Sequence, residues 1–406
     1  MIPCPACWPV RPALAVMFVV LSLAAGRAPG AAPDRFREIP ERMQRFVDDG
    51  QVAGAVTLVM REGRVLSLEA VGQADLASGR PMRTDSLFWV ASMTKPLVAA
   101  AVLALQDDGK LSVQDPVARH LPEFKSQWMV QARGSNTLSL VRPPRAVTLF
   151  DLLTHSAGLG DVPAPRADCA LAELVMAYAQ APLQFPPGSR WSYSNPGINT
   201  LGRVVEVVSG QPFPEFLERR FLRPLGMKDT TFWPDTRQAR RLATSYQPGA
   251  GGKGLEPTGI FMLGGADVTA RGRTPFPAGG LFSTAMDMAN FYGMLLDGGR
   301  WRGKTLLSPG AVEQLTRTQS GDLKTGFTDG MSWGLGFAVV KEPRGVTGML
   351  SPGTFGHGGA YGTQSWADPS RRAVYILMIQ RARLPNADAS PMRQAFQEAA
   401  VRALAE

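Results

Sequence analysis

Cysteine and histidine are scarce in this sequence, with 3 of each among its 406 residues. Cys4 and Cys7 fall within an N-terminal segment that resembles a secretory signal, which leaves Cys169 without a partner for an internal disulfide. No cluster of Cys and His has the spacing of a zinc site, so the sequence gives no case for a bound metal. We expect neither a metal nor any other cofactor.

Long apolar runs are equally scarce. The run near the N-terminus, Ala13–Ala25, is shorter than the roughly 18 residues expected of a membrane-spanning helix. It follows Arg11 and precedes a small-residue stretch ending at Ala32, which is typical of a secretory signal. We therefore expect residues 1–32 to be a signal peptide, the mature protein to be periplasmic or secreted, and no stable membrane span to remain. An uncleaved anchor is the alternative, because little charge precedes the run.

The excess of basic residues does not form a nucleic-acid-binding motif. The formal net charge is +9, but the arginines are spread along the chain without a basic helix. The simpler interpretation is solubility and attraction to anionic polymers of the cell envelope. We expect no nucleic-acid partner, and nothing in the sequence specifies an oligomeric state.

Strand patterns occur at both ends of the chain and helical patterns in the middle. Residues 53–73 form two β-branched runs around a Gly-containing turn, as in an antiparallel hairpin. These patterns predict an α/β (α+β) fold, in which one antiparallel β-sheet is flanked by helices and carries a large, mostly helical lobe. Further strands are expected over Trp333–Val340, 359–368 and 372–381, and terminal helices over 34–50 and from about Ala389.

The expected sheet lobe comprises about residues 33–90 and 300–406, and the expected helical lobe about residues 91–299. Residues from about Leu121 to Thr274 read as helices with long, Pro-rich connections. A later helix should begin with a capping box in which Asp287 faces Thr284. The cleft between the two lobes is the default position for a site.

Ser92 and Lys95 stand at the start of an apolar helix expected over about Met93–Asp108. They form the only Ser-x-x-Lys in the chain, and residues three apart share a helix face, so the amine can reach the hydroxyl. The free N–H groups of a helix start favour developing negative charge, and burial lowers the pKa of a lysine so that it can act as a base. The alternative is that Lys95 lies at this helix start only by chance.

A second candidate is the segment Trp191–Asn195. Of the 6 tyrosines, only Tyr193 has an asparagine two residues further on. Its phenol could share a proton with Lys95 and deliver it to a leaving group. A plain turn is the alternative, since Ser, Asn, Pro and Gly gather there.

A third candidate is the Gly-rich segment around His357, which enters an expected strand. Glycines at the start of a strand allow a backbone or a ligand to approach closely. A simple glycine turn is the alternative.

In this order, Ser92-Met-Thr-Lys95, Tyr193-Ser-Asn195 and His357-Gly-Gly359 resemble the motifs of the serine β-lactamase and penicillin-binding-protein superfamily. The resemblance is closer to its class C β-lactamase-like esterase branch. The segments LLTHSAGL, PAGGLFSTAMDMANF and SWGLGF extend it over essentially the whole chain after the signal. It implies that residues 33–406 form one catalytic domain with a β-lactamase/transpeptidase-like fold.

The resemblance also implies an acyl-enzyme mechanism. Ser92 would attack a carbonyl carbon, and Lys95 and Tyr193 would move the proton. The backbone N–H groups of Ser92 and Ala360 would form the oxyanion hole. Asn195 would hold the acyl side chain or orient Lys95.

The third motif departs from the family pattern. The usual Lys-Thr-Gly grips a substrate carboxylate through a cation and a hydroxyl, whereas this chain has His357-Gly358-Gly359, with no hydroxyl. Because histidine is mostly neutral at pH 7, the carboxylate would be held weakly and a neutral ester is favoured. Related D-amino-acid peptidases also have His here. A literal Lys324-Thr325-Gly326 lies in a turn-rich segment ahead of the expected strands and is not expected to replace the motif.

These observations favour a carboxylesterase or acyltransferase that acts on small esters. The alternative is a D-alanyl carboxypeptidase or a class C-type β-lactamase acting on cell-wall peptides or β-lactams. In each case the partner is a small ester, amide or β-lactam substrate. A non-catalytic protein that retains the fold is a third hypothesis, and the chemically competent residues in all three motifs count against it.

Overall fold

An antiparallel sheet brings the two ends of the described chain together. The strand β1 (Gly54–Arg61) pairs with β2 (Arg64–Asp75) on one side and with β16 (Ala373–Met378) on the other. The expectation of one sheet built from both ends is confirmed. Across the sheet the order is β12 (Met331–Trp333), β13 (Ala338–Val340), β14 (Phe355–Gly358), β15 (Gln364–Asp368), β16, β1, β2 and β3 (Arg80–Pro81).

The computed structural model describes residue 1, residues 34–164, residue 166 and residues 168–405. The expected signal peptide, residues 1–32, therefore lies outside the described residues except for Met1. Within the described segments, no helix is long and apolar enough to cross a membrane. The division into a sheet lobe and a helical lobe stays a prediction.

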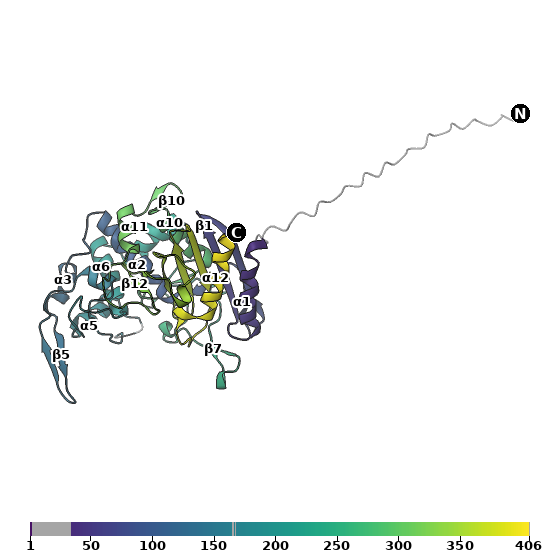
Figure 1. Ribbon diagram of the computed structural model, residues 1–406. Coiled ribbons are helices and arrows are strands. Elements are labelled where there is room, and N and C mark those ends of the chain that lie inside the picture. The colour runs from purple at the N-terminus through teal and green to yellow at the C-terminus, as the bar shows by residue number, and fades with distance from the viewer. Residues whose placement is uncertain (2–33, 165, 167, 406) are drawn as a thin grey trace. The chain divides into compact units, whose positions relative to one another are not determined.

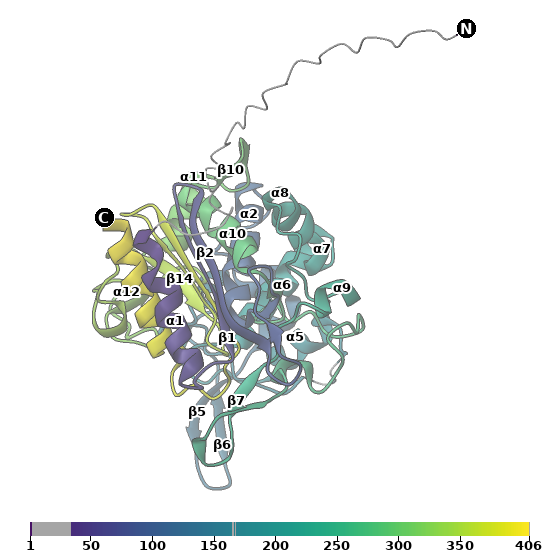
Figure 2. The ribbon, with the colours of Figure 1, turned by 90° about the vertical axis from the view of Figure 1, so that its right-hand side faces the viewer.

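Helices cover both faces of the sheet. On one face α1 (Glu38–Asp48) lies beside α12 (Pro391–Ala405), as Figures 1 and 2 show. Ile39 and Met43 are four residues apart, so both point from α1 into the core. On the other face α10 (Ala285–Leu296) packs against β1, β15 and β16.

The helix α2 (Lys95–Asp107) is apolar on all sides and is buried between neighbouring elements. It packs against α6 (Asn195–Ser209), which begins with a side-chain cap from Ser194 and ends at Gly210 with φ +70°. The other α-helices are α3 (Val117–His120), α4 (Leu149–Leu153), α5 (Leu171–Gln180), α7 (Phe213–Leu217), α8 (Arg223–Leu225), α9 (Thr236–Ala239) and α11 (Pro309–Thr316).

The segment from Leu121 to Thr274 is less helical than expected. It contains the hairpin of β5 (Met129–Arg133) and β6 (Leu138–Val141), which projects from the neighbouring helices in Figure 1. Residues on both sides of its Gly-Ser-Asn turn alternate in polarity, which is the period of a strand and not of a helix. A second hairpin joins β7 (Tyr246–Pro248) to β8 (Leu255–Pro257).

The strand expected over Trp333–Val340 is instead the hairpin of β12 and β13. Its turn is closed by the N–H of Gly334, which donates to the carbonyl of Phe337 at 2.8 Å. A Cβ on Gly334 would overlap the carbonyl oxygen of Leu315, and Gly336 has φ +74°. The two glycines therefore reverse the chain where the apolar pattern alone predicts one continuous strand.

Only half of the expected capping box at α10 is present. The hydroxyl of Thr284 accepts a hydrogen bond from the N–H of Asp287 at 3.2 Å. The carboxylate of Asp287 does not return to Thr284, because it accepts from the N–H of Asp229 at 2.8 Å and the hydroxyl of Thr230 at 2.9 Å. Burial raises the pKa of Asp287 to about 6.

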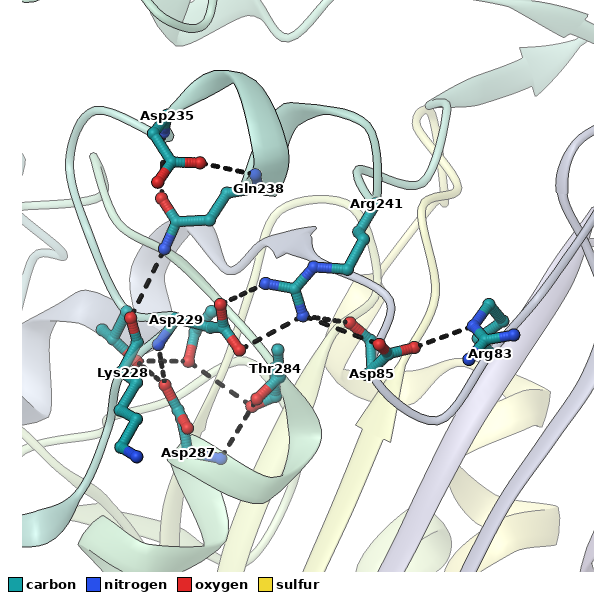
Figure 3. A network of polar contacts seen from close by, with 11 residues as sticks. Arg83, Asp85, Lys228, Asp229, Asp235, Gln238, Arg241, Thr284 and Asp287 are labelled. Carbon is teal, nitrogen blue, oxygen red and sulfur yellow. Dashed lines mark hydrogen bonds and ion pairs between the residues drawn. The ribbon is translucent and has the colours of Figure 1, made fainter.

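This network connects α10 to the chain that leads to Ser92 (Figure 3). Arg241 forms an ion pair with Asp229, and it donates to the carbonyl of Asp85 at 2.9 Å. Asp85 precedes β4 (Phe88–Trp89), which pairs with β9 (Phe282–Ser283) just before α10. The segment that leads into Ser92, from Asp85 through β4, is thus held both by Arg241 and by β9.

A glycine lets α6 approach the chain ahead of β9. A Cβ on Gly202 would lie 2.8 Å from Pro277 Cβ and closer still to its Cγ, so only glycine fits there. The N–H of the next residue, Ala278, donates a hydrogen bond to Asn199 Oδ1 at 2.9 Å. The position of Ala278 therefore depends on the close packing at Gly202.

We expect Gly202→Ala to lower the free energy of unfolding by about 1 to 3 kcal/mol, because overpacking exceeds the helix propensity that alanine adds. Gly197→Ala is the matched control in the same helix, because its nearest neighbour would lie at 3.4 Å. Urea denaturation measures both variants. Equal stability of the two variants would contradict the packing argument.

Candidate active site

Ser92 and Lys95 meet where a short 3-10 helix, η2 (Ala91–Thr94), continues into α2. The Lys95 Nζ lies 3.0 Å from Ser92 Oγ and donates to the carbonyl oxygen of Ala278 at 2.6 Å. Lys95 is fully buried, whereas Ser92 is partly exposed. The α-helix itself begins at Lys95, so the tight turn before it brings the two side chains together.

Burial lowers the pKa of Lys95 well below its usual value of 10.5. Among the described residues, no carboxylate forms an ion pair with Lys95 that would offset this effect. A neutral amine keeps a lone pair, and it can accept the proton of the Ser92 hydroxyl. The geometry therefore supplies a hydroxyl and a base in contact.

The residue before Ser92 has an unusual backbone conformation. Ala91 is buried and has φ +47°, in the left-handed region that residues with a Cβ disfavour. Such conformations persist where the surrounding structure fixes them, and they concentrate at functional sites. The Trp89 indole N–H donates to the carbonyl of Gly279 at 2.8 Å and fixes the chain nearby.

Tyr193 lies directly before α6 and faces the same amine. The Lys95 Nζ is 4.7 Å from the centre of the Tyr193 ring. Burial raises the pKa of Tyr193, and a hydrogen bond with Ser92 acts in the opposite direction to a smaller extent. Tyr193 is therefore a neutral phenol next to the Ser92–Lys95 pair.

His155 holds the Tyr193 segment in place. Its Nδ1 accepts a hydrogen bond from the N–H of Ser194 at 3.1 Å, and its carbonyl accepts from Ser192 at 2.9 Å. Both neighbours of Tyr193 are therefore bound to one residue. Burial, with the nearby Lys95, lowers the pKa of His155 well below 6.5, so this histidine adds no charge.

His357 in β14 also approaches the Tyr193 phenol. Its Nδ1 lies 2.7 Å from the carbonyl oxygen of Gly358, which can only accept, so Nδ1 carries the proton. The unprotonated Nε2 then faces the Tyr193 hydroxyl at 3.5 Å. Burial, with a smaller effect of Lys95, lowers the pKa of His357 to about 3.

The rest of the third motif packs against the chain that leads to Ser92. A Cβ on Gly359 would lie 2.6 Å from the carbonyl oxygen of Val90. The N–H of Gly359 donates to the carbonyl of Thr363, while Ala360 is exposed within the same turn. This close approach places the segments with the two expected oxyanion amides, Ser92 and Ala360, beside each other.

Asn195 is the first residue of α6, and its side chain is exposed. One turn further along, Asn199 is buried, and its Oδ1 holds the N–H of Ala278. The carbonyl of Ala278 in turn accepts from Lys95. Sequence reasoning missed Asn199, although an asparagine within the apolar face of a buried helix is itself a signal.

The literal Lys324-Thr325-Gly326 lies in the loop between α11 and β12, not on a strand. Lys324 is exposed, and the hydroxyl of Thr325 donates to the carbonyl of Met331 at 3.2 Å. The loop contributes Phe327 to the site, because its ring centre is 5.0 Å from that of Tyr193. No local sequence pattern indicates this contact.

The described residues contain no group of three or more His, Cys, Asp or Glu side chains that could hold a metal ion. The chemistry available is that of a hydroxyl, a neutral amine, a phenol and a neutral imidazole.

A mixed α/β fold with a Ser-x-x-Lys pair at the start of a buried helix defines a serine hydrolase. The model of the Beta-lactamase family matches residues 39–399, and the chain belongs to this family.

The names of similar proteins indicate more than one activity. Esterase EstB of Burkholderia gladioli is 34% identical over 365 residues, covering 81% of this chain and 86% of that protein. Penicillin-binding protein 4 of Amycolatopsis lactamdurans is 31% identical over 328 residues, covering 80% of this chain and 79% of that protein. The solved structure of EstCE1, a hydrolase with promiscuous acyltransferase activity, has a TM-score of 0.75 at 24% identity, over 90% of this chain and 98% of that chain.

The left-handed backbone at Ala91 leads to a stability prediction. Ala91→Gly loses a buried methyl group but relieves a conformation that costs about 1 to 2 kcal/mol. Ala100→Gly, within α2, loses a buried methyl group and helix propensity without any relief. In urea denaturation, Ala91→Gly should therefore lose at least about 1 kcal/mol less stability than Ala100→Gly. Similar losses in both variants would show that Ala91 is unstrained.

Proposed function

We propose that this protein is a carboxylesterase that hydrolyses small neutral esters through an acyl-enzyme on Ser92, with acyl transfer to an alcohol as a variant of the second step. The observation that carries the proposal is the 3.0 Å contact between Ser92 Oγ and the buried amine of Lys95. Because burial lowers the pKa of this amine, it is a base that can activate the hydroxyl. The similarity to esterase EstB supports the same activity.

In the first step, Ser92 Oγ bonds to the ester carbonyl carbon as Lys95 takes the hydroxyl proton. The N–H groups of Ser92 and Ala360 stabilise the oxyanion. The carbon–oxygen bond to the alcohol then breaks, and the proton passes from Lys95 to the leaving oxygen through the phenol of Tyr193. In the second step, a water oxygen bonds to the acyl carbon while Tyr193 and Lys95 take its proton. The bond from this carbon to Ser92 Oγ then breaks, the proton returns to Ser92 Oγ, and the acid is released.

The third motif favours a neutral substrate. His357 carries no charge at ordinary pH, since its pKa is about 3, and Gly358 has no hydroxyl. A substrate carboxylate would therefore meet no cation from this motif. We place His357, Gly358 and Gly359 along the bound substrate, with Asn195 at the exposed end of the site.

A second candidate is a D-alanyl carboxypeptidase or a β-lactamase, and the similarity to penicillin-binding protein 4 favours it. Both candidates form an acyl-enzyme on the same serine. Stable labelling of Ser92 by a fluorescent penicillin, together with no ester turnover, would select the second candidate.

Purified protein without residues 1–32 should hydrolyse p-nitrophenyl butyrate, and Ser92→Ala should reduce kcat/KM by at least about a thousandfold, because the nucleophile is lost. Release of p-nitrophenol measures both proteins. Ser135→Ala is the control, since Ser135 is exposed at the tip of the β5–β6 hairpin. Turnover that persists in Ser92→Ala would refute the assignment.

The pH dependence of ester turnover should show a fall on the acidic side. Lys95 acts as the neutral amine, so kcat/KM falls as the pH drops through its lowered pKa and levels off above that pKa. His357 stays neutral above about pH 3, so His357→Gln should keep the fall at a similar pH. Initial rates at low substrate concentration measure it. If kcat/KM of His357→Gln no longer decreased at acidic pH, the titrating group would be His357 and not Lys95.

A further inference from the structure

The carboxylate of Asp388 occupies the place where a side chain at Gly358, in the third motif, would lie. Asp388 belongs to the 3-10 helix η8 (Ala387–Ala389), between β16 and α12. A Cβ on Gly358 would overlap Asp388 Oδ1 and would lie 2.6 Å from Gln364 Nε2. Gly358 is therefore required because an acidic group from another part of the chain already fills the place of its side chain.

The carboxylate faces a buried cation. Arg393 is 1% exposed, and its guanidinium lies 4.1 Å from the centre of the Trp366 ring. Its Nη1 donates to the backbone carbonyl of Asp388 at 2.6 Å and lies 4.0 Å from the carboxylate Oδ1. Burial lowers the pKa of Arg393 to about 10, so it stays charged at neutral pH. Its buried Nη2 has no hydrogen-bond partner among the described residues.

This ion pair adjoins the third motif. Asp388 and Arg393 line a small cavity together with His357, Gly358 and Phe327. The loop that carries Phe327 is tied to the same segment, because Asn386 Nδ2 donates to its carbonyl at 2.8 Å.

The electrostatic effect of Asp388 reaches the candidate acid of the reaction. Its negative charge raises the pKa of Tyr193, in addition to the larger effect of burial. Burial raises the pKa of Asp388 itself, and the charge of Arg393 acts against that rise. A substrate placed between Tyr193 and the third motif would therefore experience the same charge.

We propose that Asp388 determines substrate specificity by holding the anion position beside the third motif, so that Arg393 is neutralised from within the chain and substrates with a carboxylate there are rejected. The proposal rests on the proposed function and narrows it to esters that are neutral along the third motif. A second carboxylate would meet a like charge without a free cation to offset it. With a neutral residue at position 388, Arg393 would become available to an incoming anion.

The test compares two esters that differ in one charge. The esters 3-carbamoylphenyl butyrate and 3-carboxyphenyl butyrate have the same size, and a pH-stat follows the hydrolysis of each at pH 8. The wild-type protein should favour the neutral ester in kcat/KM by at least about tenfold. In Asp388→Asn this ratio should shrink by about tenfold or more. An unchanged ratio, or a wild-type protein that does not discriminate, would overturn the proposal.

Asp368→Asn is the matched control. Asp368, the last residue of β15, is a buried aspartate that, like Asp388, lies beside an arginine, here Arg371. It lies at the opposite end of β15 from Gln364, about 13 Å away at the rise of a strand. Its ratio should equal that of the wild-type protein. If Asp388→Asn fails to fold, as judged by circular dichroism, the smaller Asp388→Ser carries the same expectation.

A second measurement separates this proposal from the esterase assignment. The boronic acids 3-carbamoylphenylboronic acid and 3-carboxyphenylboronic acid form reversible adducts with an active serine, and calorimetry gives their Kd values without any turnover. If the wild-type protein hydrolyses neither ester, the esterase assignment fails, and the boronic acids decide the role of Asp388. A preference for the neutral acid that shrinks only in the Asp388 variants supports it, whereas an equal preference in all variants overturns it.

Discussion

Lys95 is fully buried, and among the described residues its amine forms hydrogen bonds only with uncharged groups, the Ser92 hydroxyl and the Ala278 carbonyl. A charged ammonium group in such a place would carry a large desolvation cost, so the fold favours the neutral amine. The nearby packing positions the Ala278 carbonyl to which this amine donates. Asn199 fixes Ala278, and the missing side chain of Gly202 lets α6 come close enough for that contact. The lowered pKa of Lys95, on which the proposed reactivity of Ser92 depends, thus follows from how the helices pack.

The surrounding titratable groups keep the site uncharged. Burial raises the pKa of Tyr193 and lowers the pKa values of His155 and His357. Each group is therefore neutral, and a proton can pass among the hydroxyl, amine and phenol without a permanent ion pair to hold it. The charges nearest the third motif, Asp388 and Arg393, balance each other. This differs from a site designed to bind an anion, where an unpaired cation must remain.

The sequence predicted those parts of the fold and site that depend on local spacing. The contact between Ser92 and Lys95 could be predicted because the two residues are three apart at the start of a helix. The sheet could be predicted from the strand patterns at both ends of the chain. Local patterns could not reveal Asp388 or Phe327, because only tertiary packing brings them to the third motif. They also missed the hairpin within Trp333–Val340, where the break depends on how closely Leu315 approaches. Burial by distant segments decides such features.

The order of strands also limits how this chain can fold. The central strand β1 forms early in the sequence, but its partner β16 lies near the C-terminus, and Arg42 pairs with Glu398, 356 residues further on. Contacts between such distant residues slow folding, because a long loop must close before they contribute any stability. During synthesis the N-terminal hairpin must therefore wait for nearly the whole chain with one edge of β1 unpaired. Such an open edge is prone to aggregation until the last strands arrive.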